Sequence, residues 1–97
     1  MTEPVVLINL FTMPPELVDN FVARWVDNAE RMKNATGFRG TTLHRAIDSD
    51  SPFPLVNVAQ WDSVEDWQAA VGGRFNRQAS GPVTSQPALY TVVHVTG

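Results

Sequence analysis

The chain has 97 residues, the length of one domain, and its 43% hydrophobic and 18% charged residues are the proportions of an ordinary globular protein. Its formal net charge of −3 argues against nucleic acid or an anionic membrane as the main partner. Because the chain has no cysteine, disulfides, thiolate catalysis and cysteine-ligated metals are excluded. We therefore expect a single domain over residues 1–97.

The hydrophobic segments predict neither a membrane span nor a secretion signal. None approaches the roughly 18–20 consecutive apolar residues that a transmembrane helix needs. The segment before and within the first apolar run contains no basic residue, so it lacks the charged start of a signal peptide. The expected compartment is the cytoplasm.

The first half of the sequence predicts a strand, a long helix and a second strand. Val5–Thr12 is a nearly continuous apolar strand, and Pro15 suits the first turn of a following helix. Over residues 16–35 the apolar side chains fill one half of a helical wheel and the charged ones fill the other, which predicts an amphipathic helix. Gly37 then ends the helix with a positive φ, and residues 40–48 form the next strand.

The following segment predicts a strand and a short helix. Residues 49–54, which contain two prolines, form a turn before the strand Leu55–Trp61. The sequence Ser63-Val64-Glu65-Asp66 fits a capping box, so a helix begins there and continues to about Val71. Gly72 and Gly73 end or bend this helix.

The C-terminal quarter predicts a last strand. Residues 74–79 fit a short turn, residues 80–87 are polar and rich in proline and therefore fit a loop, and residues 88–96 fit a strand. The resulting order is β-α-β-β-α-β, the ferredoxin-like arrangement of the α+β class. It predicts a four-stranded antiparallel sheet with both helices on one side.

Three of these strands are apolar at almost every position: VVLINLF at 5–11, LVNVAQW at 55–61 and LYTVVHV at 89–95. Near-continuous apolar runs are typical of strands that are buried on both faces. Two helices can cover only one face of the sheet, so we expect a second copy of the chain to cover the other. The sequence thus predicts a homodimer.

Several segments resemble the antibiotic biosynthesis monooxygenase family of the dimeric α+β barrel superfamily. They are LINLFTMPPE, Thr36-Gly37-Phe38, Leu43-His44-Arg45, NVAQWDS at 57–63 and Pro87-Ala88-Leu89-Tyr90. The resemblance covers nearly the whole chain. It implies a homodimer whose two sheets form a barrel, with a pocket between the helices and the sheet of each subunit. Members include cofactor-free oxygenases that turn anthrone-type polyketides into quinones, and haem-degrading enzymes share the fold.

Two residues stand out as candidates for chemistry in such a pocket. Asn9 interrupts an apolar strand, and a buried amide is either bonded within the structure or directed into a pocket. Trp67 lies on the inward face of the second helix, where it is either a core residue or a wall that stacks on a flat substrate. The resemblance implies pocket roles for both, because haem-degrading relatives carry an asparagine near the first position and a tryptophan in this helix.

The two histidines, His44 and His94, are the side chains that titrate near neutral pH and could act as a general base. Neither has a partner at metal-ligand spacing, so no metal site is predicted. His44 alternates with Leu43 and Arg45 and therefore lies on the opposite face of the sheet from them. Each histidine could instead be a hydrogen-bonded sheet or interface residue.

Four further residues are predicted to bind substrate: Asn57, Trp25, Phe21 and Arg74. Asn57 shares its side of the strand with Trp61, which itself resembles a structural tryptophan of the family. Trp25 and Phe21 lie on the apolar side of the first helix. Arg74 could bind an anionic or enolate oxygen at the pocket mouth, or be solvated surface charge.

The leading hypothesis is a cofactor-independent monooxygenase that uses O2 to oxidise a small polycyclic phenol, with Asn9, Trp67 and His44 as catalytic residues. One alternative is haem binding and degradation. Haem-degrading relatives ligate iron with a histidine after the second helix, whereas residues 74–79 contain none. The other alternative is a dimer that binds a small ligand without catalysis.

Overall fold

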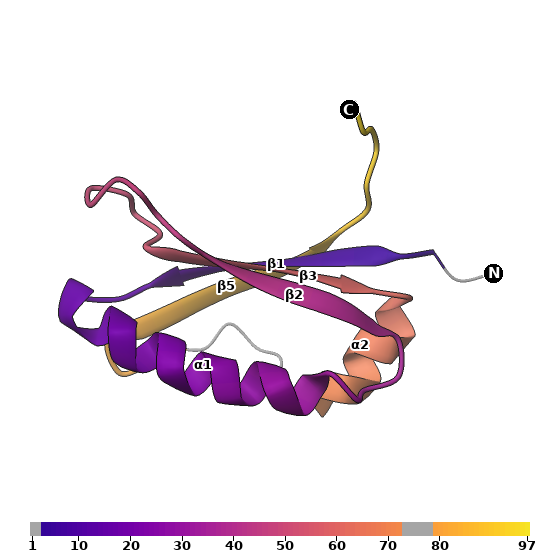
Figure 1. The fold of residues 1–97 in the computed structure, drawn as a ribbon, viewed down its shortest axis with the longest axis horizontal. Helices are drawn as coiled ribbons and strands as arrows, with labels where there is room; N and C mark the ends of the chain where they lie inside the picture. The colour runs from indigo at the N-terminus through magenta and orange to yellow at the C-terminus, as the bar shows by residue number, and fades with distance from the viewer. Residues whose placement is uncertain (1–2, 73–78) are drawn as a thin grey trace.

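The computed structural model describes residues 3–72 and 79–97 and has the predicted ferredoxin-like architecture (Figure 1). In chain order the elements are β1 (Val5–Thr12), the 3₁₀ turn η1 (Pro15–Leu17), α1 (Val18–Met32), β2 (Phe38–Arg45), β3 (Leu55–Trp61), α2 (Val64–Val71), β4 (Ala79–Ser80) and β5 (Val83–Tyr90). The four long strands form an antiparallel sheet in the order β2-β3-β1-β5, and the two-residue β4 pairs with β5. The predicted four-stranded sheet is therefore confirmed, with β4 as a short addition.

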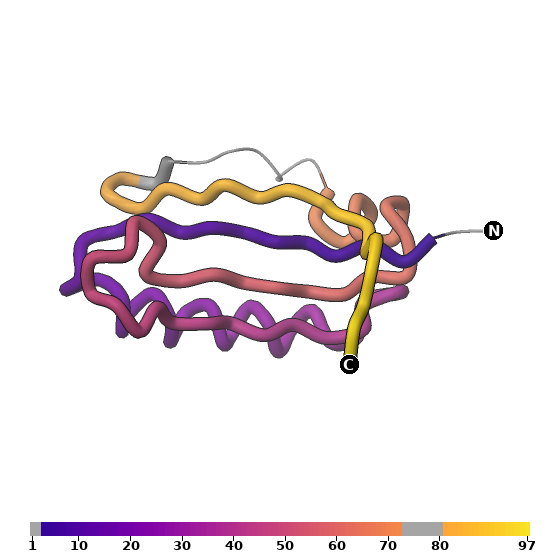
Figure 2. The backbone as a smooth tube through the Cα atoms, turned by 90° about the horizontal axis from the view of Figure 1, so that it is seen from above, coloured from indigo at the N-terminus to yellow at the C-terminus, as the bar shows by residue number. Residues whose placement is uncertain are grey.

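Both helices lie on one side of the sheet (Figure 1), and β1 lies between β3 and β5 (Figure 2). Side chains alternate between the two faces of each strand, so every second residue of β1 and β3 packs toward the helices. These inward residues are the most buried of the two strands: Val5, Leu7, Phe11, Leu55, Asn57, Ala59 and Trp61. They form two core clusters, one around Trp61 and Trp67 and one around Phe11 and Leu55.

The other face of the sheet is also apolar. It carries Val6, Ile8 and Leu10 from β1 and Val56 and Val58 from β3, all of them half-buried. Neither helix covers this face, because both lie on the opposite side (Figure 1). The prediction of strands that are apolar on both faces is therefore confirmed for β1 and β3. We call these five residues the open face.

The predicted boundaries of the last strand were wrong. β5 spans Val83–Tyr90, so it includes most of the predicted loop, and residues 91–97 project away from the sheet on its open side (Figures 1 and 2). Tyr90 already pairs with Val6 near the beginning of β1, so few residues remain for the chain beyond it to pair with. Pro87 is tolerated within β5 because β4 pairs only with Val83 and Thr84, so among the described strands this part of β5 is an edge of the sheet.

The C-terminal segment, residues 91–97, exposes apolar side chains. Val92, Val93 and Val95 are 64%, 95% and 78% exposed. The valine-rich pattern that predicted a strand is therefore present, but within the described chain it has no neighbouring strand.

The junctions around the helices differ from the predicted bounds by a few residues. The 3₁₀ turn replaces the predicted start of the first helix, and α1 ends at Met32. Gly37 has the expected positive φ of 82°, and Phe38 follows it at once as the first residue of β2. The Phe38 ring packs edge-on to Trp61 with a centroid distance of 5.1 Å, so it packs against the core. None of the helices in the described ranges is long and apolar enough to cross a bilayer.

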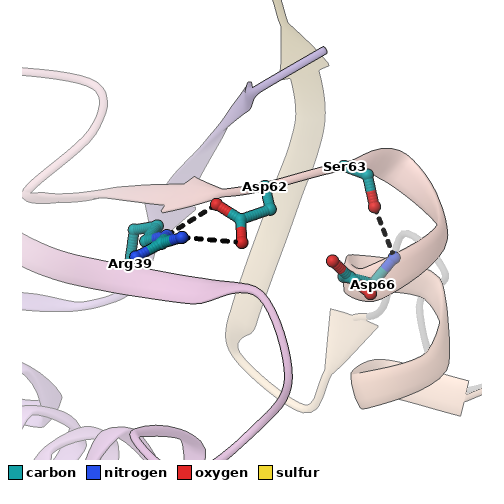
Figure 3. A network of polar contacts seen from close by, with 4 residues as sticks. All are labelled: Arg39, Asp62, Ser63 and Asp66. Atoms are coloured by element: carbon teal, nitrogen blue, oxygen red, sulfur yellow. Dashed lines mark hydrogen bonds and ion pairs between the residues drawn. The ribbon is translucent and has the colours of Figure 1, made fainter. Parts of the chain in front are cut away.

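A set of polar contacts joins β2, β3 and α2 (Figure 3). The guanidinium of Arg39 donates to both carboxylate oxygens of Asp62, at 2.6 and 3.0 Å, and these hydrogen bonds lower the pKa of Asp62. The Ser63 Oγ accepts from the backbone N–H of Asp66 at 3.1 Å, which confirms the predicted N-cap of α2. The Asp62 backbone N–H also donates to the Gly37 carbonyl at 2.8 Å. These bonds fix α2 against the turn before β2.

Replacing Gly37 with alanine should destabilise the fold more than the same change at Gly81. Both residues have positive φ, +82° and +60°, which disfavours a side chain by roughly 1–2 kcal/mol. A Cβ on Gly37 would also lie 2.6 Å from the Cβ of Asp66, whereas one on Gly81 would meet nothing within 4 Å. We expect the free energy of unfolding to fall by roughly 3 kcal/mol for Gly37→Ala and by roughly 1 kcal/mol for Gly81→Ala in urea titrations. Equal losses would contradict the close approach of α2.

Candidate functional site

A cavity of about 320 Å³ lies between the two helices and the inward face of the sheet. Its described lining consists of apolar, aromatic, amide and hydroxyl side chains: Leu7, Asn9, Phe11, Phe21, Trp25, Asn28, Ala29, Met32, Phe38, Thr41, Asn57, Ala59, Trp61, Trp67 and Val71. None of these described lining residues is ionisable. Apolar walls with a few polar groups are typical of a site for a small molecule.

Aromatic rings form the walls of this cavity. All three tryptophans of the chain line it, Trp25 from α1, Trp61 from β3 and Trp67 from α2. Phe21 lies against Phe11 with a centroid distance of 4.8 Å and a tilt of 56°. Because the rings come from both helices and from the sheet, they can contact a flat apolar ligand from several sides.

Two asparagines lie side by side on the floor of the cavity. Asn9 of β1 and Asn57 of β3 are direct partners in the strand register, and both line the cavity. Side chains that face each other across antiparallel strands have Cβ atoms roughly 5 Å apart. The sheet thus presents two carboxamides at one place in otherwise apolar surroundings.

The hydrogen bonds of the two amides show which atoms a ligand could use. The hydroxyl of Thr41 donates to Oδ1 of Asn57, a residue that is only 8% exposed. Oδ1 of Asn9 is buried and accepts no hydrogen bond from the described residues. In Asn57 the remaining polar group is therefore the NH2, a hydrogen-bond donor, whereas Asn9 leaves its Oδ1, an acceptor, without a described partner.

The buried oxygen of Asn9 is costly for stability. A buried acceptor without a partner destabilises a fold by roughly 1–3 kcal/mol. An amide retained only for structure would be expected to have its bonds satisfied within the protein. Asn9 therefore lines the cavity with an oxygen that has no partner among the described residues, and its role toward a ligand stays a prediction.

Five of the predicted site residues come together in this cavity: Asn9, Asn57, Trp67, Trp25 and Phe21. Trp67 is 7% exposed and belongs to the core cluster, so it is a core residue that also lines the cavity, and its stacking on a substrate stays a prediction. Arg74 lies outside the described residues.

The structure does not bring His44 to the cavity. Thr41 and Leu43 of β2 pair across from the inward residues of β3, so His44 points to the other side of the sheet. Its side chain is exposed, and Nδ1 lies 3.2 Å from the carbonyl oxygen of Val56. His94 lies in the exposed C-terminal segment, next to the hydroxyl of Thr96. Within one protomer, neither histidine is placed to act with Asn9 and Trp67.

Among the polar and aromatic lining residues, sequence reasoning missed five: Phe11, Asn28, Phe38, Thr41 and Trp61. Trp61 was interpreted as structural, but it lines the cavity, and its buried indole N–H has no acceptor among the described residues. The period-two alternation that places Asn57 on the inward side places Trp61 there as well, so that signal could have identified it. In the described ranges, no group of three or more metal-ligating side chains could hold an ion.

Solved structures share this fold. The crystal structure of a candidate monooxygenase from Shewanella loihica PV-4 is 29% identical, with a TM-score of 0.81 and coverage of 98% of this chain and 99% of that one. A heme-degrading protein from Mycobacterium tuberculosis is 26% identical, with a TM-score of 0.75 and coverage of 100% and 99%. SnoaB, a cofactor-independent oxygenase from Streptomyces nogalater, is similar in fold, with 20% identity, a TM-score of 0.74 and 97% coverage of both chains.

The family assignment comes from the sequence itself. No curated protein matches the chain significantly. Residues 4–74 match the model of the antibiotic biosynthesis monooxygenase family, and this range includes all the strands and helices that form the described cavity walls. The chain therefore belongs to the antibiotic biosynthesis monooxygenase family.

Proposed function

We propose that this protein is a cytoplasmic, cofactor-independent monooxygenase that oxidises a small polycyclic phenol of the anthrone type to a quinone. The observation that carries the proposal is the pair of asparagine amides, Asn9 and Asn57, at the floor of an aromatic cavity. Flat walls and two neighbouring carboxamides, whose NH2 groups can donate, suit a planar ring system with an oxygen that becomes negatively charged.

In the proposed reaction, O2 supplies the oxidising power. One oxygen atom becomes the new ring carbonyl, and the other leaves as water with the two hydrogens of the anthrone methylene carbon. Loss of the first proton gives a delocalised anion, which then donates an electron to O2. The substrate itself thus carries the reactive electrons, and the balance requires no other reductant.

The protein's contribution would be to make that anion more stable. Donors aimed at a developing oxyanion in a site shielded from water stabilise it strongly. Hydrogen bonds to the charged form also lower the pKa of the bound substrate. The described lining residues include no general base, so in this scheme the proton leaves to water while the NH2 groups of Asn9 and Asn57 hold the oxygen. The planar rings of the substrate would lie against the indoles of Trp25, Trp61 and Trp67.

The direct test is to incubate the chelator-treated protein with several anthrones and measure quinone absorbance and O2 uptake. We expect quinone to form faster than in buffer, with one O2 consumed per anthrone. Rates equal to buffer for every anthrone would contradict the substrate assignment. Tryptophan fluorescence quenched by the ligand without any turnover would support the non-catalytic binding alternative, since all three tryptophans line the cavity.

Replacing Asn9 with valine should reduce activity while raising stability. The change removes one donor to the oxyanion, a loss that lowers kcat by roughly 10²-fold in other oxyanion sites. It also removes from a β-strand an Oδ1 that has no partner among the described residues, so we expect the free energy of unfolding to rise by roughly 1 kcal/mol. Asn20→Ala, on the exposed surface of α1, is the control and should leave the rate unchanged. An Asn9→Val protein that is less stable than wild type would favour the structural interpretation.

The haem alternative is favoured by the similarity to the heme-degrading protein, but the described cavity does not fit haem well. Neither histidine of the chain lines it, since His44 faces the other side of the sheet and His94 lies beyond β5. We expect a haemin titration to give no saturable Soret shift at one haem per chain. A sharp stoichiometric shift, lost on substitution of a cavity residue such as Met32 but not of exposed Asn20, would revive haem as the ligand.

We also propose that two copies of the chain pair through their open faces. Val6, Ile8, Leu10, Val56 and Val58 form a contiguous apolar surface on the central strands, and the exposed valines of residues 91–97 lie on the same side. Sheets that pack face to face bury such surfaces about 10 Å apart. A two-fold arrangement would let each copy cover the other with the same residues.

Changing Ile8 to lysine should therefore disrupt the dimer. Ile8 is central to the open face, because it pairs with Val58 on one side and Ala88 on the other. Val26→Lys, on the exposed side of α1, makes the same type of change away from that face and serves as the control. By light scattering with size-exclusion chromatography we expect a dimer for wild type and Val26→Lys and a monomer for Ile8→Lys. A monomeric wild type at micromolar concentration would rule out this interface.

A further inference from the structure

We infer that Thr41 is a positioning residue that fixes the polarity of the site, because its hydroxyl holds the Asn57 amide with the NH2 group toward the cavity. This inference rests on the proposed function, since it specifies how Asn57 would meet a substrate oxygen. Nothing in the sequence pattern indicated a role for Thr41.

The strand register brings the two side chains together. Thr41 of β2 pairs with Ala59, and Asn57 of β3 pairs with Leu43, so Thr41 and Asn57 are diagonal neighbours on the inward face. The Thr41 Oγ1 donates to Oδ1 of Asn57, and both residues line the cavity. The contact joins residues 16 positions apart in the chain, across two strands.

The side-chain amide of asparagine has an acceptor, Oδ1, and a donor, the NH2 group. Rotation about the last side-chain torsion, χ2, exchanges their positions. That torsion is broad and roughly two-fold, so packing alone specifies it weakly. In the structure the Thr41 hydroxyl donates to Oδ1 and leaves the NH2 group for the cavity, whereas an amide turned the other way would donate to Thr41 and leave its oxygen for the cavity. Because Asn57 is 8% exposed, bulk water cannot readily replace this bond. Thr41 therefore holds Asn57 in the orientation whose NH2 group faces a ligand.

The orientation matters because the two ends have opposite effects on a negative charge. The NH2 group stabilises a developing oxyanion, whereas an amide oxygen in the same place would repel it. The orientation of Asn9 is not held in this way, since its Oδ1 accepts no hydrogen bond from the described residues. Of the two amides on the floor, Asn57 is the one held by a side chain.

Three variants test the inference by steady-state oxidation of an anthrone. Thr41→Val removes the hydroxyl and keeps the branched shape, Thr41→Ser keeps the hydroxyl, and Thr42→Val makes the same change on the opposite, exposed side of β2. We expect Thr41→Val to lower kcat roughly 10-fold with KM within about twofold, a smaller loss than the 10²–10³-fold seen when a donor is removed. Thr41→Ser should retain most of the wild-type kcat, and Thr42→Val should have the same kcat as the wild type.

A double-variant comparison separates action through Asn57 from a general effect on the fold. If Thr41 acts only by orienting Asn57, then adding Thr41→Val to Asn57→Ala should cause no further loss of kcat. Multiplicative losses in the double variant would overturn the inference, as would a Thr41→Val enzyme with wild-type kcat.

A measurement without substrate keeps this inference distinct from the proposed function. In ¹⁵N relaxation experiments the side-chain NH2 of Asn57 should be ordered in the wild type and in Thr41→Ser, and its order parameter should fall in Thr41→Val. If the wild type oxidises no anthrone but the order parameter falls as expected, the proposed reaction fails and the positioning role stands. An Asn57 amide that is equally ordered in Thr41→Val overturns the positioning role, whatever the activity.

Discussion

The register of β1 against β3 is the constraint on which the candidate site depends. It sets Asn9 opposite Asn57 and turns both amides toward the helices. A slip of one residue in either strand would move that amide to the open face and place an apolar side chain in the cavity. The register is fixed by the core, because the same alternation buries Leu7, Phe11 and Leu55 beside the amides. Packing of apolar residues therefore positions the polar ones.

The cavity combines a strongly apolar wall with polar groups that the described protein satisfies only in part. Asn9 and Trp61 each bury a polar atom without a described partner, while the Asn57 oxygen is paired with Thr41. A fold optimised for stability alone would replace such groups with apolar residues. Binding sites commonly retain this kind of destabilising arrangement, because unpaired donors and acceptors are ready to bind a ligand.

The sheet has two apolar faces with different surroundings. The helices close one face and form the cavity, while the open face and the valines of the C-terminal segment have no cover within the described chain. The two faces are coupled through the strands, since each residue that points into the cavity is flanked by residues that point to the open face. Association through the open face would therefore stiffen the floor on which Asn9 and Asn57 lie.

The sequence by itself determined the order of elements, the amphipathic helix, the cap at Ser63, the inward position of Trp67 and the shared face of Asn57 and Trp61, because these follow from local periodicity and local hydrogen bonds. The alternation of side chains along β2 also predicted that His44 and Leu43 lie on opposite faces of the sheet. Only the packed helices showed that the face with Leu43 is the inward one. The tertiary structure alone decided where β5 ends, since this depends on the length of β1, its partner. It alone revealed the bond between Thr41 and Asn57, because pairing between distant strands leaves no periodic signal in either one.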